Sequence, residues 1–88
     1  MSLRHRLTGY SKRTEFLEFA FVVPAEHERR VVQAMGFPAS DPGGEGGYPL
    51  SPALARSVGE MVGAAPINVD AYDWFLEPVP APLHRAVA

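Results

Sequence analysis

The chain has 88 residues, of which 47% are hydrophobic and 20% are charged, and its formal net charge is −2 at pH 7. This composition is typical of one globular domain and excludes a disordered chain, and so short a domain has no room for a deep, enclosed active site beside a separate core. The chain lacks cysteine, an apolar run long enough to span a membrane, and a signal-peptide region, so we expect no disulfides or thiol chemistry and a cytoplasmic location.

Two segments near the N-terminus have the pattern of β-strands. Apolar or small residues alternate with polar ones from Leu3 to Tyr10. Residues 16–23 form a second, more apolar strand whose inward residues are Leu17, Phe19, Phe21 and Val23. Because this second strand alternates least and is the most apolar, we place it at the centre of the sheet.

The two strands are expected to form a hairpin whose register follows from side-chain alternation. Inward Leu7 must face inward Leu17 or Phe19, because a slip of one residue would turn arginines toward the core. This condition requires a loop with an odd number of residues. A three-residue loop places Arg6 opposite Glu18, an opposite-charge pair that contributes about 0.2–1 kcal/mol. We therefore prefer that register.

The first helical segment follows directly. Pro24 fits a first helical turn, and the helix is expected to end near Met35 with a left-handed Gly36, since Pro38 confirms the stop. The glycine-rich stretch 41–47 then indicates a long, flexible connector.

The second helical segment has clear start and stop signals. Ser51 serves as N-cap, Pro52 occupies the first helical position, and Gly63 ends the helix. Residues 71–77 read as a third strand, and the prolines of 78–88 predict a flexible tail. The sequence thus predicts a single α+β domain over residues 3–77, in the order β-β-α-α-β, with a three-stranded sheet and two helices packed on one face.

No constellation for catalysis stands out. His27 begins like a zincin motif, but Val31 occupies the position of the second ligand. Asp73 and Glu77 share one side of a strand, about 13 Å apart at ~3.3 Å per residue, too far to share a proton. We expect no enzymatic activity, no cofactor and no metal, and a small-molecule role around His27 and the 41–47 loop stays open as a third alternative.

The most suggestive group is a set of aromatic and charged residues on the outer side of the sheet. An apolar centre with a charged rim is a common design of protein interfaces. The leading hypothesis is a non-enzymatic protein-interaction domain that binds a protein partner or its own copy. A refinement of this hypothesis is an inhibitor or immunity-type protein that covers the basic site of an enzyme. The proposed surface consists of Arg6, Tyr10, Phe16, Glu18, Asp73, Phe75 and Glu77.

The alternative is a single-stranded nucleic-acid-binding module that uses the basic N-terminal hairpin. Four basic residues are few for this role, and acids on neighbouring strands would weaken their field, so nucleic acid is the less favoured partner. The hairpin residues concerned are Arg4, Arg6, Tyr10, Lys12, Arg13 and Phe16.

Several short motifs in a fixed order carry a resemblance to a known family. They are Gly9-Tyr10-x-Lys12-x-Thr14, Leu17-x-Phe19, Gly36-Phe37-Pro38 with Asp41-Pro42, Tyr48-Pro49-Leu50 and Tyr72-Asp73-Trp74-Phe75-Leu76-Glu77. Over about residues 7–77 the chain resembles a family of small, uncharacterised bacterial domains of unknown function. It departs from that pattern in the glycines of 43–47. The resemblance implies no activity, cofactor or catalytic residue.

Overall fold

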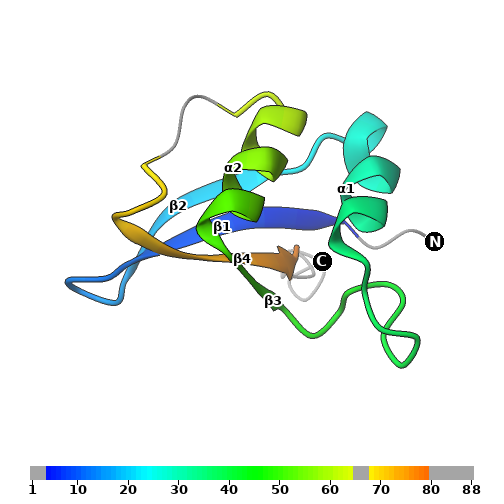
Figure 1. Cartoon of the computed structure of the whole chain (residues 1–88), viewed down its shortest axis with the longest axis horizontal. Coiled ribbons are helices and arrows are strands. Elements are labelled where there is room, and N and C mark those ends of the chain that lie inside the picture. Colours follow the sequence, from blue (N-terminus) through cyan, green and yellow to red (C-terminus); the bar gives the residue numbers. More distant parts are fainter. Residues whose placement is uncertain (1–3, 65–67, 80–88) are drawn as a thin grey trace, which may run out of the picture.

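A sheet of four antiparallel strands and two α-helices form the layers of this domain (Figure 1). The computed structural model describes residues 4–64 and 68–79. Its elements, in chain order, are β1 (His5–Ser11), β2 (Leu17–Val22), a 3₁₀ turn (Ala25–His27), α1 (Glu28–Met35), β3 (Tyr48–Leu50), α2 (Pro52–Met61) and β4 (Tyr72–Pro78). The predicted α+β class is confirmed, and the order is β-β-α-β-α-β.

The sheet differs from the prediction in two respects. It has a fourth strand, β3, and its strand order β2-β1-β4-β3 places β2 at an edge rather than at the centre. β1 lies between β2 and β4, and Gly9 leaves room there for a ring of β4, since an added Cβ would lie 3.0 Å from the ring of Trp74. The apolar character of β2 was a poor guide, since its apolar side chains are divided between the core and solvent.

The hairpin of β1 and β2 contains a β-bulge. Gly9 faces Phe19, but Tyr10 faces Leu17, so Glu18 is an additional residue in β2. The bulge reverses the alternation at this point. Phe19 therefore lies on the side of the helices, whereas Leu17 shares the opposite face with Tyr10.

The bulge also explains why the predicted register is wrong. The turn lies between Ser11 and Phe16, and the N–H of Ser11 donates to the carbonyl oxygen of Phe16 at 2.9 Å. This turn has an even number of residues, which by itself would turn the apolar side of β2 away from the core. The extra residue in β2 returns Phe19 and Phe21 to the side of the helices. Arg6 consequently faces Val22 of β2, not Glu18.

Buried side chains of both helices join those of one sheet face in a single core. α2 also packs against β1, β3 and β4, and α1 packs against α2. Both helices therefore cover the face that carries the inward residues of β1 and β4, and within residues 4–64 and 68–79 no helix lies on the other face. The buried apolar residues are Leu7, Val23, Val31, Leu50, Ala55, Val58, Val62, Val69, Trp74 and Leu76.

The helix ends follow local signals in the sequence. α1 ends at Gly36, whose backbone is left-handed with φ 60° and whose N–H donates to the carbonyl of Val32 at 3.3 Å, as predicted. Ser51 caps α2, since its hydroxyl accepts from the N–H of Leu54 at 3.2 Å. Pro24 precedes the 3₁₀ turn, so α1 begins later than predicted.

Hydrogen bonds to one side chain connect the turns of the glycine-rich loop. The carboxylate of Asp41 accepts from the N–H groups of Glu45 and Gly46 at 3.0 and 2.9 Å, and from the hydroxyl of Tyr48 at 2.7 Å. The Tyr48 bond is the largest cause of a pKa of Asp41 below its ordinary value of 3.8. The stability from this carboxylate is therefore present above pH 3.8 and is lost as the pH falls further.

Within residues 4–64 and 68–79, no helix is long and apolar enough to cross a membrane. The predicted tail begins at Pro78, which is the last residue of β4 and faces His5 of β1. The N–H of Val79 donates to the carbonyl of Arg4 at 2.8 Å. The rest of the predicted tail, 80–88, lies outside the described residues.

Candidate interaction surface

The pairing of β1 with β4 brings five of the predicted surface residues together. Arg6 faces Glu77 and Tyr10 faces Asp73, with Phe75 between the two acids on β4. Their side chains alternate with the buried ones and lie on the face away from the helices. We call this face the open face. It also includes the exposed side chains of Leu17 and Val22 on β2 and of Phe16 just before that strand.

Glu77 links two residues of β1 across the open face. Its Oε2 accepts a hydrogen bond from the hydroxyl of Tyr10 at 2.9 Å, and its Oε1 lies 3.5 Å from Nη2 of Arg6. The bond to Glu77 is the largest cause of a pKa of Tyr10 above its ordinary value of 10.0, and burial adds to it. Arg6 and Glu77 thus neutralise each other in the middle of this face.

A shallow depression of about 360 Å³ lies beside the aromatic pair of the open face. The rings of Tyr10 and Phe75 meet edge to face, with 5.6 Å between their centroids and an interplanar angle of 86°. The other residues that line the depression are Glu15, Asp73 and Glu77. Glu77 is paired with Arg6, so the aromatic wall with Glu15 and Asp73 favours a cationic side chain over an anion.

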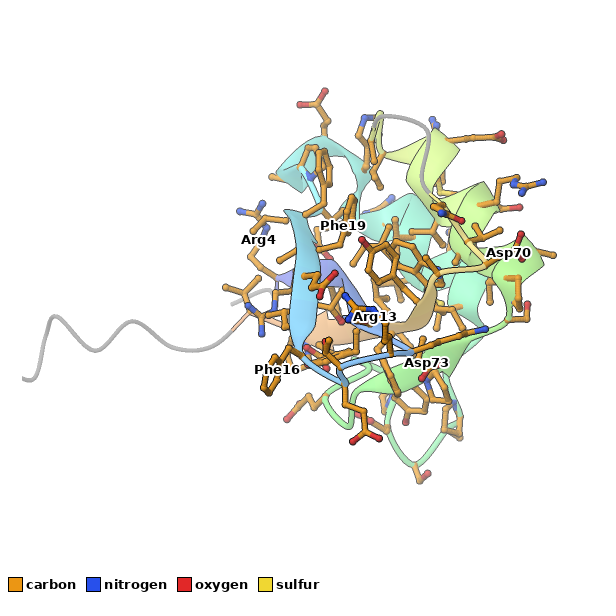
Figure 2. All side chains as sticks on the ribbon, turned by 90° about the vertical axis from the view of Figure 1, so that its left-hand side faces the viewer. Arg4, Arg13, Phe16, Phe19, Asp70 and Asp73 are labelled. Atoms are coloured by element: carbon orange, nitrogen blue, oxygen red, sulfur yellow. The ribbon has the colours of Figure 1, made fainter. Side chains whose placement is uncertain are left out.

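The largest exposed apolar side chains lie along β2. Phe16 is 74% exposed, Val22 50% and Leu17 42%. Figure 2 shows Phe16 and Phe19 on opposite sides of β2, with Phe19 toward the helices. An edge strand therefore carries a strip of apolar surface that the helices do not cover.

The predicted aromatic patch is divided into two parts. Tyr10 and Phe75 are half-buried against each other, whereas Phe16 does not line the depression beside them. Leu17 joins the open face unexpectedly, because the bulge at Glu18 reverses its direction. Sequence reasoning missed Leu17 because it assumed unbroken alternation along the strand. A turn with an even number of residues between the two strands would have indicated the bulge, because only an extra residue then keeps the apolar side chains on the core side.

Replacing Glu77 with glutamine should bring the pKa of Tyr10 back toward 10.0. In the native protein, ionisation of Tyr10 would place a phenolate beside a carboxylate, so folding stability is lost as the pH rises above 10.0 through the raised pKa. Tyrosine ring-carbon shifts, followed by NMR against pH, measure this titration. Asp73→Asn is the control, since it removes a carboxylate of β4 but not the hydrogen bond; an unchanged Tyr10 titration in Glu77→Gln would contradict the assignment.

A second polar cluster surrounds His5 at the start of β1. The His5 side chain is 1% exposed, with Nδ1 2.9 Å from Oε1 of Glu28 and Nε2 2.9 Å from the carbonyl oxygen of Gly43. Each ring nitrogen therefore lies within hydrogen-bonding distance of an oxygen atom. The ring also stacks on Phe37 with 5.9 Å between centroids. His5 thus joins α1 and the glycine-rich loop to the sheet.

The basic residues proposed for nucleic-acid binding are partly engaged within the domain. Nε of Arg4 lies 3.5 Å from Oε2 of Glu28, and Arg6 contacts a carboxylate of β4. Lys12 and Arg13 are exposed at the turn of the hairpin. The positive charge available to a polyanion is therefore smaller than the sequence count indicates.

His27, the residue of the third alternative, lies in the 3₁₀ turn before α1, and its Nε2 is 3.9 Å from Oε2 of Glu26. In the described parts of the chain, no three His, Cys, Asp or Glu side chains are grouped so as to hold a metal ion. The glycine-rich loop instead directs one of its carbonyls to His5. Among the described residues, no polar contact joins His27 to the glycine-rich loop.

Comparison with known proteins gives one match. A family model described as "Domain of unknown function (DUF7683)" matches residues 4–77, which include every strand and helix but the last residue of β4. No curated protein and no solved structure matches the chain. The chain belongs to this DUF7683 family of domains of unknown function.

Proposed function

We propose that this domain is a non-enzymatic protein-interaction module that docks a partner on the open face. The observation that carries the proposal is the strip of exposed apolar side chains formed by Leu17 and Val22 of β2 and by Phe16, the residue before that strand. These side chains lie on a sheet layer whose other face packs against both helices. Removing them from water on docking is favourable by about 25 cal/mol per Å² of apolar area before the cost of association.

The charged groups around this strip give the surface its specificity. Glu18 lies on β2 itself, and Asp73 is exposed on β4 beside the depression. Arg6 and Glu77 pair with each other, which leaves Glu18 and Asp73 as the acids that a partner would meet here. A partner with a basic docking surface suits this arrangement, which supports the inhibitor or immunity type, because complementary charge speeds encounter and penalises wrong partners.

The nucleic-acid alternative has less support. Binding of single strands needs a positive groove that follows the backbone, together with exposed rings for base stacking. Here Arg4 and Arg6 contact carboxylates, and Phe16 is the one hairpin aromatic that is largely exposed among the described residues. The depression beside Tyr10 is lined by acids, which repel phosphate.

Changing Phe16 and Leu17 together to aspartate should abolish capture of the partner and leave the fold intact. Both side chains are exposed, so the change removes docking surface without opening the core. Capture from the native lysate and light scattering measure the loss, and the circular dichroism spectrum checks the fold. Raised salt should also slow association of the unchanged protein with a basic partner.

The matched controls place the same charge on the helix layer. Ala34 of α1 and Ala53 of α2 are exposed, and Ala34→Asp with Ala53→Asp should bind as the unchanged chain does. If the variant of the open face still captures the same partner at the same strength, or if the helix controls lose it, the proposal is wrong.

A further inference from the structure

The depression beside Tyr10 and Phe75 is small and shallow. Its volume of about 360 Å³ is at the low end of the range of ~300–1,000 Å³ that ligand pockets occupy. The two rings, at right angles to each other, both line it, and at one end Glu77 is already bonded to Tyr10 and Arg6. A shallow hollow covers only one side of a bound group. It therefore suits a side chain that the surface of a partner holds in place.

Two carboxylates at the other end of the depression have no cation of their own. Glu15 lies in the turn after β1, and Asp73 faces Tyr10 near the start of β4. Figure 1 shows this turn and the start of β4 at the same end of the sheet. Lys12 and Arg13 belong to the same turn, yet among the described residues no ion pair involves either carboxylate. The negative charge at this end is therefore available to a ligand.

The backbone of Glu15 is strained at this position. Its φ of 67° lies in the left-handed region, and within residues 4–64 and 68–79 no other residue except glycine has a positive φ. Glycine or asparagine adopts this conformation at a lower cost than glutamate. The turn thus places a carboxylate at the depression where a less strained residue would satisfy the backbone. Residues held in such conformations are concentrated at binding sites.

We propose that the depression binds the guanidinium group of an arginine side chain that a protein partner presents. A planar guanidinium can lie against a ring and donate to carboxylates at the same time, whereas an ammonium group is a strongly hydrated point charge. The aliphatic stem of the arginine covers the rings of Tyr10 and Phe75, and its head reaches Glu15 and Asp73. The inference deepens the proposed function, on which it rests, because it names the group by which a basic partner is anchored to the open face.

The test uses a blocked tripeptide with arginine between two glycines as the probe. We expect it to shift the amide signals of Asp73 and Phe75 and the ring signals of Tyr10 in an NMR titration. A Kd of about 1–10 mM is expected for so small a contact. The same peptide with citrulline, which has a similar shape but no charge, should leave these signals unchanged, and the lysine peptide should bind more weakly. Equal binding of either control peptide, or no shift with arginine, overturns the inference.

A pair of matched double variants separates the depression from the charge of the whole domain. Glu15→Gln with Asp73→Asn should weaken binding of the arginine peptide about tenfold, since two exposed ion pairs are lost. Glu60→Gln with Asp70→Asn removes the same two charges at exposed positions that do not line the depression, and should bind as the unchanged chain does. Equal losses in the two variants would show a general attraction between charges and overturn the site.

Glu15→Asn covers the case in which the turn, and not the charge, decides the result. It should weaken the arginine peptide and unfold at the same or a higher temperature, because asparagine relieves the backbone. Lower stability with unchanged binding would contradict the role of Glu15. If the peptide fails to bind while partner capture still requires Phe16 and Leu17, the inference is wrong and the proposed function stands. If the peptide binds but partner capture does not require those two residues, the proposed function falls and the arginine site stands.

Discussion

Replacing His5 with phenylalanine should lower the free energy of unfolding by about 2–4 kcal/mol. Phenylalanine keeps a flat ring that can stack on Phe37, but it is larger than histidine, so the change removes the hydrogen bonds of the ring and adds some crowding. Those bonds satisfy Oε1 of Glu28 and the carbonyl of Gly43. Without them two part-buried oxygens lose a hydrogen bond, and the loss is about 1–3 kcal/mol for each one that water does not reach.

Urea unfolding measures the effect as a shift of the midpoint at constant slope. Glu28→Gln is the companion variant, because its amide oxygen still accepts from the backbone N–H of His5, which donates to Glu28 at 2.8 Å. It should cost less than His5→Phe. A loss below about 1 kcal/mol for His5→Phe would show that water satisfies the oxygens of Glu28 and Gly43. It would contradict the view that the hydrogen bonds of His5 connect the sheet to α1 and the loop.

Replacing Gly44 with alanine should cost about 2–4 kcal/mol. The backbone of Gly44 is left-handed with φ 67°, and an added Cβ would lie 2.3 Å from two ring carbons of Phe37. The ring cannot move freely, since it packs between His5 and Tyr48 at centroid distances of 5.9 and 4.9 Å. The substitution therefore adds a steric clash to the backbone strain.

Two other glycines separate the two contributions. Gly36 has nearly the same backbone, φ 60°, but a Cβ there meets nothing within 4 Å, so Gly36→Ala should cost only the backbone part of about 1–2 kcal/mol. Gly43 has no positive φ, and its Cβ would lie 3.9 Å from the carboxylate of Glu45, so Gly43→Ala should stay within about 0.5 kcal/mol. Thermal unfolding orders the three variants; equal losses at Gly36 and Gly44 would contradict the clash with Phe37.

Local signals in the sequence predicted the ends of the helices. Gly36 and Ser51 act through the backbone groups next to them, so a few residues suffice to recognise their roles. Pro24 was misassigned because proline suits the start of a 3₁₀ turn as well as that of an α-helix. Asp41 was not recognised as the anchor of its loop, although aspartate before Pro-Gly-Gly is a known signal for side-chain bonds to the following backbone.

Non-local features could not be read in the same way. β3 has three residues and includes Pro49, too few for a pattern, and it exists because β4 provides a neighbour. The bulge at Glu18 depends on how the turn and the core pack together, which no alternation within β2 reveals.

The candidate surface was predictable where alternation is unbroken. Arg6 and Tyr10 on β1, and Asp73, Phe75 and Glu77 on β4, lie on one face because each strand keeps its period of two. Their adjacency follows from strand pairing. The exposed strip along β2 was not foreseen, because it depends on the edge position of that strand and on the bulge.

Amide hydrogen exchange, measured for each residue with the partner present and absent, tests the account most directly. For a protein partner or a second copy, we predict slower exchange on β2 and the neighbouring open face, with the amides of α1 and α2 unchanged. Protection that appears on the helices instead, with β2 unchanged, would contradict the assignment of the open face as the docking surface.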